Sequence, residues 1–322
     1  MRELLWGVAL GAAGFLFVVG PGLLTASAPV SGFRMTVSAA QHEAGDTPGA
    51  VTGSAGQPGW LRYVNRLRAL GGLAPVGWSR SWSRGDRLHA RYMVKNEVLS
   101  HAEDPAKPWY TPAGAAAARS GNVMASSTTS TSNRQAIDVW MTGPFHGVGI
   151  IDPELRQAGY GAYRESDGGW EMAATLDVLR GLRAAPTGLK LPVMWPGDGV
   201  TTPLRGYYGG EFPDPLASCP DYTAPAGAPI ILQVGLGSGT PNVAAHSLRT
   251  GGVAVEHCIY SESTYTSPDS SAQSLGRAVL SMRDAIVIMP RSPLTQGADY
   301  EVSITADGNA YTWTFRVSEA AR

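Results

Sequence analysis

The sequence predicts an α+β domain followed by an all-β sandwich. Between residues 59 and 180, apolar residues first recur at helical spacing and then alternate as in a β-hairpin. Residues 181–228 are rich in proline and glycine, and from residue 229 short segments alternate with a period of two. Helices followed by antiparallel strands are typical of a layered α+β domain, and a series of short strands is typical of a sandwich.

Three helices are expected in the first domain. Apolar residues spaced by three begin at Trp60, and Gly71-Gly72 ends this segment. A second helix is expected over residues 80–98. The third is expected to begin after Ser132, because Ser132 and Gln135 have the spacing of a capping box.

Hairpins are expected in both domains. Gln157–Arg164 and Trp170–Val178 alternate around a polar turn in the first domain. In the second domain, Asp307-Gly308-Asn309 separates the last two alternating segments and is a strong hairpin turn. Residues 253–260 are expected to form one strand. The connector 181–228 is too aromatic for a free linker, so we expect it to pack on one of the domains.

The front of the chain predicts export. Leu4–Leu24 is a nearly continuous apolar stretch, long for a signal peptide and just long enough to span a bilayer. Residues 1–40 are therefore a signal peptide or an N-terminal membrane anchor, and residues 41–58 a flexible linker. The protein is expected to be extracellular or anchored on the outer face of the membrane, with membrane contact only through residues 4–24. Cys219 and Cys258 fit an exported protein with one disulfide.

Charge excludes one class of partner. The chain has 322 residues, with 25 Lys+Arg against 26 Asp+Glu and a net charge of −1. No long basic run interrupts this balance, which argues against a protein that binds nucleic acid through its phosphates.

Three histidines of the first domain are the candidates for chemistry, because the sequence lacks a nucleophile elbow, an H-E-x-x-H motif and a P-loop. His89 lies one turn from Asp86 on the second helix and is expected to be a buried structural residue, although it is also a candidate for a cleft with His101, His146 and Asn122. His101 and His146 follow helices, where neutral imidazoles can meet in a cleft to bind a divalent metal or exchange protons.

The order of six short motifs resembles the CAP superfamily, the cysteine-rich secretory, antigen 5 and pathogenesis-related group, in its bacterial, SCP-like form. The resemblance implies a three-layer α-β-α sandwich over residues 59–180. The motifs are Asn65–Val76, His89-Ala90 with Met93, Leu99–His101, Gly121–Val123, Ala136–His146 and Ala158–Ala162.

The resemblance also implies a cleft in which two histidines and two acidic groups can bind a divalent cation such as zinc. His101 and His146 match the two histidines, and Asn122 matches the asparagine of the G-E-N motif. The glutamate of that motif is replaced by Gly121, which leaves two strong ligands where a closed zinc site needs four. Three carboxylates remain as possible substitutes: Glu103, Asp104 and Asp138.

The C-terminal segment has a resemblance of its own. Pro293–Tyr300, followed by alternating strands and Tyr311–Phe315, is similar to the end of a bacterial Ig-like domain. The resemblance implies an Ig-like sandwich over residues 229–318. Such domains mostly space or present a neighbouring domain at a cell surface.

Three functions remain open at this level. The favoured one is a secreted or surface-tethered, non-enzymatic binding module for a cell-envelope, lipid or protein ligand. The second is an extracellular or cell-envelope hydrolase that uses His101 and His146 with a divalent cation, and it predicts a carboxylate within hydrogen-bond reach of His146. The third is a protein that binds a lipid or another apolar ligand, which needs a hydrophobic groove.

Overall fold

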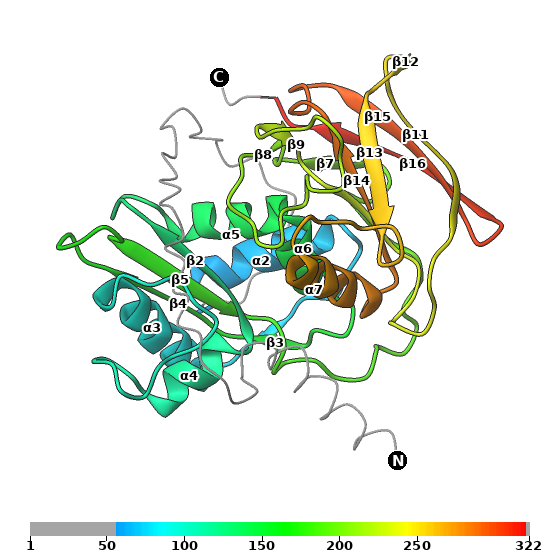
Figure 1. Ribbon diagram of the computed structural model, residues 1–322. Helices are drawn as coiled ribbons and strands as arrows, with labels where there is room; N and C mark the ends of the chain where they lie inside the picture. Colours follow the sequence, from blue (N-terminus) through cyan, green and yellow to red (C-terminus); the bar gives the residue numbers. More distant parts are fainter. Residues whose placement is uncertain (1–55, 320–322) are drawn as a thin grey trace.

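The computed structural model describes residues 56–319 and contains two lobes in contact (Figure 1). The expected signal peptide or anchor, residues 1–40, lies outside this range, as does most of the linker 41–58. No helix within residues 56–319 combines the length and the apolar composition needed to cross a membrane. We call residues 56–182 the N-terminal lobe and residues 183–319 the C-terminal lobe.

Helices and a short antiparallel sheet make up the N-terminal lobe. Its helices are α2 (Gly59–Ala69), α3 (Arg80–Lys95), α4 (Pro112–Ala118), α5 (Asn133–Thr142) and α6 (Pro144–Ile150). Its strands are β1 (Gly77–Trp78), β2 (Gly121–Ser126), β3 (Gln157–Ala158), β4 (Tyr160–Arg164) and β5 (Met172–Asp177). The main sheet has the order β2-β5-β4, and β1 pairs with β3 separately.

Local signals explain where these helices begin. The capping box predicted at the start of α5 is present: the Ser132 side chain accepts from the Gln135 amide, and the Gln135 side chain accepts from the Ser132 amide. Ser79 caps α3 by accepting from the Trp82 amide. The three expected helices and the first hairpin are therefore confirmed, whereas α4, α6 and β2 were not predicted.

The sheet of the N-terminal lobe is buried on both faces. Successive residues of β2 point to opposite sides, so Val123 and Ala125 pack with Met93 of α3, whereas Met124 belongs to the larger core with Trp140 of α5. Helices α3 and α4 thus cover one face, and α2 and α5 cover the other (Figure 1). The result is a three-layer α-β-α arrangement.

The C-terminal lobe contains two large sheets whose strands are mostly antiparallel, a two-stranded sheet and one helix. The four-stranded sheet has the order β13-β14-β10-β6, and the five-stranded sheet has the order β12-β11-β15-β16-β7. Apolar residues of both sheets belong to one core cluster, as expected for a sandwich. That the sandwich is Ig-like stays a prediction. The strands are β6 (Val193–Trp195), β7 (Val200–Thr202), β10 (Ile230–Gln233), β11 (Val243–Thr250), β12 (Val253–Ala254), β13 (His257–Ser261), β14 (Ala285–Pro290), β15 (Asp299–Ala306) and β16 (Asn309–Val317), and the helix is α7 (Ser270–Ser281).

Several details of this lobe test the expected elements. The hairpin β15–β16 is present, and Asp307 and Gly308 at its turn both have positive φ angles, as a tight two-residue turn requires. Cys219 and Cys258 form the expected disulfide. The single strand expected over 253–260 is wrong: Val253 is exposed, and the segment divides into β12 and β13, which belong to different sheets.

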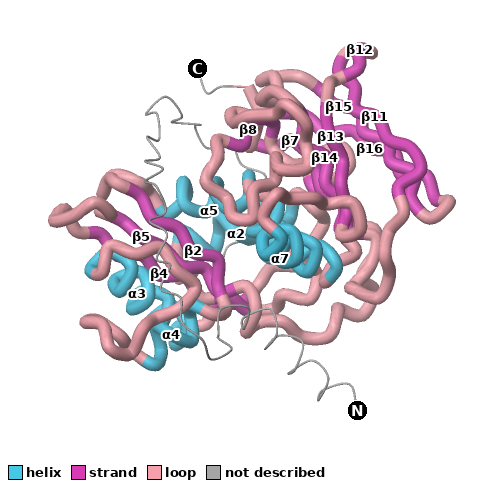
Figure 2. Tube along the Cα trace, viewed as in Figure 1, coloured by secondary structure: helices cyan, strands magenta, loops and turns pink. Residues whose placement is uncertain are grey.

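The connector 181–228 is part of the C-terminal lobe (Figure 2). Its first half supplies β6 to one sheet and β7 to the other, so the sandwich begins well before residue 229. Two further strands, β8 (Gly206–Tyr207) and β9 (Ala226–Gly227), pair with each other in its second half. As expected from its aromatic residues, the connector packs onto a domain.

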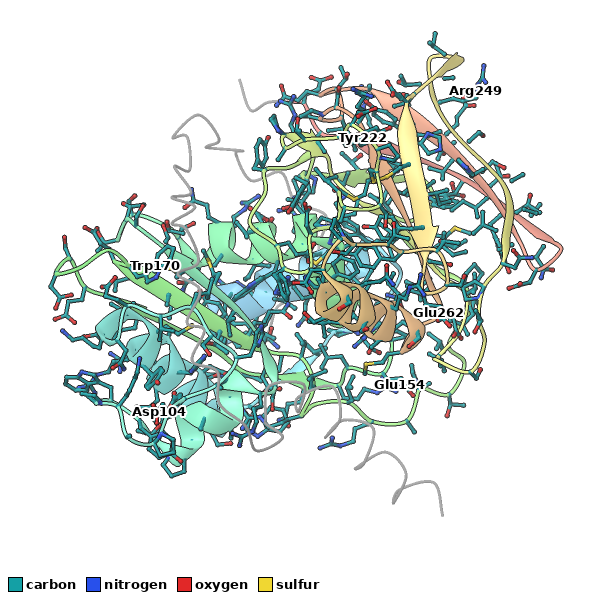
Figure 3. All side chains as sticks on the ribbon, viewed as in Figure 1. Asp104, Glu154, Trp170, Tyr222, Arg249 and Glu262 are labelled. Carbon is teal, nitrogen blue, oxygen red and sulfur yellow. A yellow bond between two sulfur atoms is a disulfide. The ribbon has the colours of Figure 1, made fainter. Side chains whose placement is uncertain are left out.

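A continuous apolar core joins the two lobes. Side chains fill the space between the lobes (Figure 3). Trp195 of β6 is fully buried, and its indole nitrogen donates to the Leu67 carbonyl of α2 at 3.0 Å. Phe145 of α6 packs edge-on against Tyr265, with 5.0 Å between ring centroids. The C-terminal lobe is therefore fixed against α2 and α6 rather than suspended on a linker.

Candidate functional site

His101 and His146 lie near each other at the surface of the N-terminal lobe. His101 follows α3 and is held by a hydrogen bond from its Nδ1 to the Ala118 carbonyl of α4, at 3.2 Å. His146 is the third residue of α6. The two rings are close enough for the charge of His146 to contribute to the lowered pKa of His101. Although His101 is exposed, the main cause of that lowering is the packing of protein around its ring.

The second helix places His89 in the core, as expected of a structural residue, so its assignment to the candidate cleft is wrong. Its Nδ1 contacts Glu103 Oε1 at 3.0 Å, and its Nε2 contacts the Ser100 carbonyl at 2.8 Å. Because both ring nitrogens are engaged, His89 has no nitrogen left for a ligand. Glu103 is equally committed, since its second oxygen accepts from the Thr111 amide at 2.9 Å.

Asn122 supports the position of His146 without facing a ligand. Its side-chain amide donates to the His146 carbonyl at 3.2 Å, and the residue is buried. This bond ties the start of β2 to α6. The arrangement fits a residue that holds the backbone around the histidine.

A carboxylate does reach His146, but it comes from the C-terminal lobe. Glu211 Oε1 lies 2.8 Å from His146 Nδ1 and also accepts from the His146 backbone amide at 2.9 Å. The Glu211 side chain is 3% exposed and that of His146 is 16% exposed. Burial raises the pKa of Glu211, whereas the hydrogen bond and the charge of His146 act in the opposite direction.

Two glycines explain why the carboxylate comes from this direction. A Cβ at Gly121 would lie 2.8 Å from the Leu176 carbonyl of the neighbouring strand, so the position of the family glutamate cannot carry a side chain without a backbone shift. A Cβ at Gly143 would lie 2.6 Å from the Glu211 carboxyl group. The absence of a side chain at Gly143 therefore makes room for Glu211.

The other candidate carboxylates serve elsewhere. Asp138 accepts a hydrogen bond from the Tyr63 hydroxyl, and Asp104 accepts a hydrogen bond from the Ala106 amide.

The sequence did not predict the contact with Glu211, which is 65 residues away from His146 along the chain. The only available signal was the aromatic composition of the connector around it, which predicted packing but identified no partner.

Residues 61–173 match the family model of the cysteine-rich secretory proteins, CAP. We call them the CAP segment. Among solved structures, the chain is similar to an extracellular protein containing a SCP domain from Bacillus anthracis str. Ames, with 13% identity and a TM-score of 0.30. That similarity covers 37% of this chain and 39% of the other, so the chain spans about two fifths of that protein. No curated protein matches the chain.

A closed zinc site does not fit the donor atoms around the CAP histidines. Within residues 56–319, no group of three or more histidine, cysteine, aspartate or glutamate side chains could hold a metal. His101 and His146 each use Nδ1 for a protein partner, which leaves two Nε2 atoms as donors. Glu211 binds at Nδ1, on the other side of the imidazole, so it does not complete a set of four ligands.

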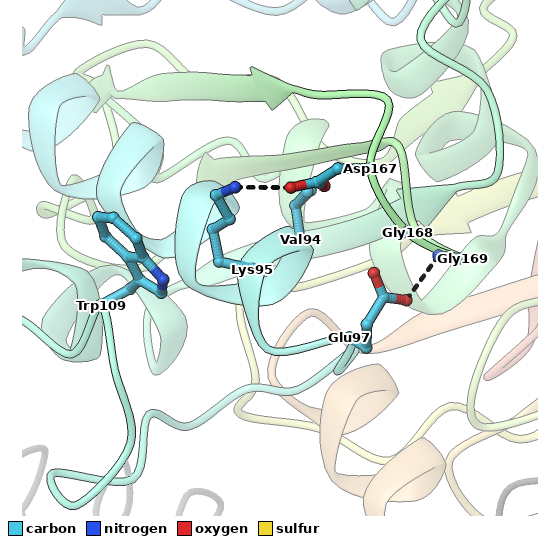
Figure 4. A pocket seen from close by; sticks show the side chains of 7 residues that line it. All are labelled: Val94, Lys95, Glu97, Trp109, Asp167, Gly168 and Gly169. Atoms are coloured by element: carbon cyan, nitrogen blue, oxygen red, sulfur yellow. Dashed lines mark hydrogen bonds and ion pairs between the residues drawn. The ribbon is translucent and has the colours of Figure 1, made fainter.

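Hollows elsewhere in the CAP segment do not include these histidines. One hollow lies between the end of α3 and the β4–β5 turn (Figure 4). Its charged groups already have partners: Lys95 pairs with Asp167 at 2.8 Å, and Glu97 accepts from the Gly169 amide at 3.0 Å. A second hollow lies over α2 and the start of α5.

Proposed function

We propose that this is an exported or surface-tethered protein whose CAP segment acts as a non-enzymatic binding module for a cell-envelope ligand. The burial of Glu211 beside His146 in the contact between the lobes carries this proposal, because it gives that contact a structural role. The contact joins the C-terminal lobe to one of the two CAP histidines, so that His146 supports the joint between the lobes. The Ig-like spacer role of the C-terminal lobe belongs to the same proposal.

The chemistry around the histidines supports a role in binding. No serine, threonine or cysteine side chain within residues 56–319 hydrogen-bonds His101 or His146, so neither histidine has a side-chain nucleophile to activate. The Glu211 carboxylate is buried beside His146, and its Oε2 lacks a hydrogen-bond partner among the described residues. The exposed group that a ligand can reach is His101.

A hydrolase is the second candidate, and one observation favours it. The hydrolase hypothesis requires a carboxylate within hydrogen-bond reach of His146, and Glu211 meets that requirement at 2.8 Å. A carboxylate at Nδ1 keeps the proton on that nitrogen, so Nε2 can accept a proton from water as a general base. His101 would then act beside it as the second proton-exchanging group.

The lipid hypothesis has less support. It requires a hydrophobic groove. The hollow at the end of α3 is lined mainly by polar groups, and the hollow over α2 and α5 combines aromatic rings with three arginines. We therefore keep it only as an alternative to the binding module.

One experiment distinguishes the first two candidates. Full-length protein is mixed with purified cell-wall sacculi and sedimented, and both the bound protein and the soluble wall fragments are measured. The binding module predicts that the protein sediments with the wall and releases no fragments, and that a His101→Ala variant sediments less. Arg84→Gln, at an exposed position of α3, is the matched control.

Two outcomes would contradict the proposal. Release of wall fragments by the wild type, abolished in Glu211→Gln, would establish the hydrolase instead. Failure of the wild type to sediment would exclude the wall as ligand. Thermal melting with zinc and with chelator completes the test, because a native-state ligand at a hundred times its Kd adds about 2.7 kcal/mol. We expect no zinc-dependent rise in Tm.

A further inference from the structure

The hollow over α2 and α5 has a volume of about 550 Å³ and is lined by three arginines. Arg62 and Arg66 come from α2, and Arg134 comes from the first turn of α5. We propose that this hollow binds a phosphate group. The phosphate site does not depend on the role proposed for the CAP histidines, but its lipid source rests on the surface tethering proposed above.

The positive charges of the three arginines have few acidic partners among the described residues. The Arg66 side chain makes no hydrogen bond or ion pair within the range 56–319, and the Arg62 side chain donates only to the Gln57 carbonyl. Arg134 lies 4.0 Å from Asp138, whose carboxylate already accepts from Tyr63. Arg62 and Arg66 are also one helical turn apart, which costs stability unless an anion lies between them.

The rest of the lining fits a phosphate ester better than a bare ion. Trp60 and Tyr63 are buried at the hollow, and the Arg134 guanidinium lies 4.6 Å from the Tyr63 ring centroid, which fixes its plane. Asn133 adds an amide, and Arg164 contacts its side-chain oxygen at 2.8 Å. Arginine forks match phosphate oxygens in pairs, and the aromatic rings offer a surface for the carbon part of an ester.

The position of the hollow favours the headgroup of an anionic lipid as the source of that phosphate. Pro58 and Gly59 line the hollow, so the chain enters the described structure at its edge. In the sequence, 33 residues (25–57) separate the apolar stretch Leu4–Leu24 from Pro58. A membrane anchor there would keep the arginines within reach of the lipid surface, where anionic headgroups attract basic side chains.

Hydrogen exchange on the full chain in vesicles tests whether an anionic lipid headgroup supplies the phosphate. The protein is reconstituted in phosphatidylcholine vesicles with or without phosphatidylglycerol, and amide exchange is followed in peptides covering residues 59–66 and 133–135. We expect slower exchange in both peptides with phosphatidylglycerol. The protection should be lost in the Arg66→Gln/Arg134→Gln double variant and kept in Arg84→Gln, which carries the same change on α3.

A soluble phosphate ester tests whether the hollow binds a free phosphate compound instead of a lipid headgroup. Glycerol 3-phosphate is titrated into the protein in phosphatidylcholine vesicles by calorimetry. Each arginine that contacts phosphate should contribute about a tenfold change in Kd when replaced by glutamine, and higher salt should weaken binding. Binding in this arm without protection by phosphatidylglycerol supports the phosphate site and assigns it to a soluble ester.

The proposal is overturned if neither phosphatidylglycerol nor glycerol 3-phosphate has an effect, or if the double variant responds like the wild type. Because all three arginines are exposed, their replacement should leave the fold intact. Unchanged melting of the double variant in neutral vesicles confirms this. Arg66→Lys, which keeps the charge and loses the planar fork, should bind more weakly than the wild type and more tightly than Arg66→Gln.

Discussion

Glu211 Oε1 accepts two hydrogen bonds from His146, one from the backbone amide at 2.9 Å and one from Nδ1 at 2.8 Å. A single carboxylate oxygen thus fixes both the start of α6 and the direction of the imidazole. Since the two residues belong to different lobes, the orientation of a CAP histidine depends on a segment outside the CAP segment.

We therefore expect Glu211→Leu to lower the free energy of unfolding by about 1–3 kcal/mol, because it leaves a buried amide without an acceptor. Glu211→Gln keeps an acceptor and should cost less. Nitrogen-detected NMR of the imidazoles should show the proton of His146 on Nδ1 in the wild type. The same spectrum of Glu211→Leu should lose that preference. Glu256→Leu, at an exposed ion pair with Arg291, is the control.

Arg283 and Asp152 form a buried ion pair between the lobes, with 2.8 Å between Nη2 and Oδ2 and about 5% exposure on each side chain. Arg283→Met should cost about 3–5 kcal/mol, because the remaining carboxylate is buried without its partner. Adding Asp152→Asn should restore part of the loss. Denaturant unfolding measures both.

An exposed arginine provides the comparison for this pair. Arg316 is 42% exposed and pairs with Asp299 at 2.9 Å, so Arg316→Met should cost less than about 1 kcal/mol. Equal losses for Arg283→Met and Arg316→Met would show that the interlobe pair has no special weight.

Asp86 is a buried carboxylate in α3 whose two oxygens have no hydrogen-bond partner among the described residues. Burial and the charge of Asp177 raise the pKa of Asp86 to about 8, against the opposing charge of Arg180. The folded state then holds a proton that the unfolded state releases near pH 4, so this contribution to stability is lost as the pH rises toward 8. Asp86→Asn should flatten this dependence and stabilise the protein above pH 8 by about 1–3 kcal/mol.

Unfolding midpoints in urea at several values from pH 5 to 9 measure this effect. If Asp86→Asn and the wild type lose stability in parallel as the pH rises, Asp86 is ionised in the folded protein and its proposed protonation is wrong.

His246 and His257 join the two sheets of the C-terminal lobe, with 2.8 Å between His246 Nδ1 and His257 Nε2. His257 Nδ1 faces the Val255 carbonyl and donates to it, so His257 Nε2 is the acceptor for His246. Burial, and then the charge of His257, lower the pKa of His246. His246 therefore binds a proton in the unfolded chain at a higher pH than in the folded protein. The stability that depends on neutral His246 is lost as the pH falls below about 6.5.

His246→Gln should reduce the loss of stability between pH 7 and pH 5. The effect should stay below about 1 kcal/mol, because His246 is exposed to solvent. Since His101 also has a lowered pKa, its alanine variant is measured alongside to separate the two contributions. A pH profile identical in His246→Gln and wild type would exclude the histidine pair as a source of acid sensitivity.

Much of the N-terminal lobe was predictable from local patterns. The capping box at Ser132 marked the start of α5, and alternation marked the β4–β5 hairpin, because both signals depend on residues close in the sequence. Strand β2 was not predicted, since it is buried on both faces and its small residues lack alternation. Helix α7 was not predicted either, because segments that alternate with a period of two surround it after residue 229.

The candidate site was only half predictable. Short motifs identified His101 and His146 because their spacing within the CAP segment is itself the signal. The three carboxylates that were possible substitutes for the lost glutamate, Glu103, Asp104 and Asp138, all lie within the same segment. Residues in contact across a lobe boundary share no periodicity, so Glu211 carried no mark that distinguished it from other glutamates.

By itself, the sequence determined the helices with local caps, the tight hairpin at Asp307-Gly308, the disulfide pair and the likeness to the CAP family. Only the tertiary structure decided which carboxylate reaches His146 and which arginines share a hollow. The physical reason is that caps and turns depend on hydrogen bonds between near neighbours in the chain. The positions of Glu211 and Arg134 depend instead on how two lobes and two helices pack around one apolar core.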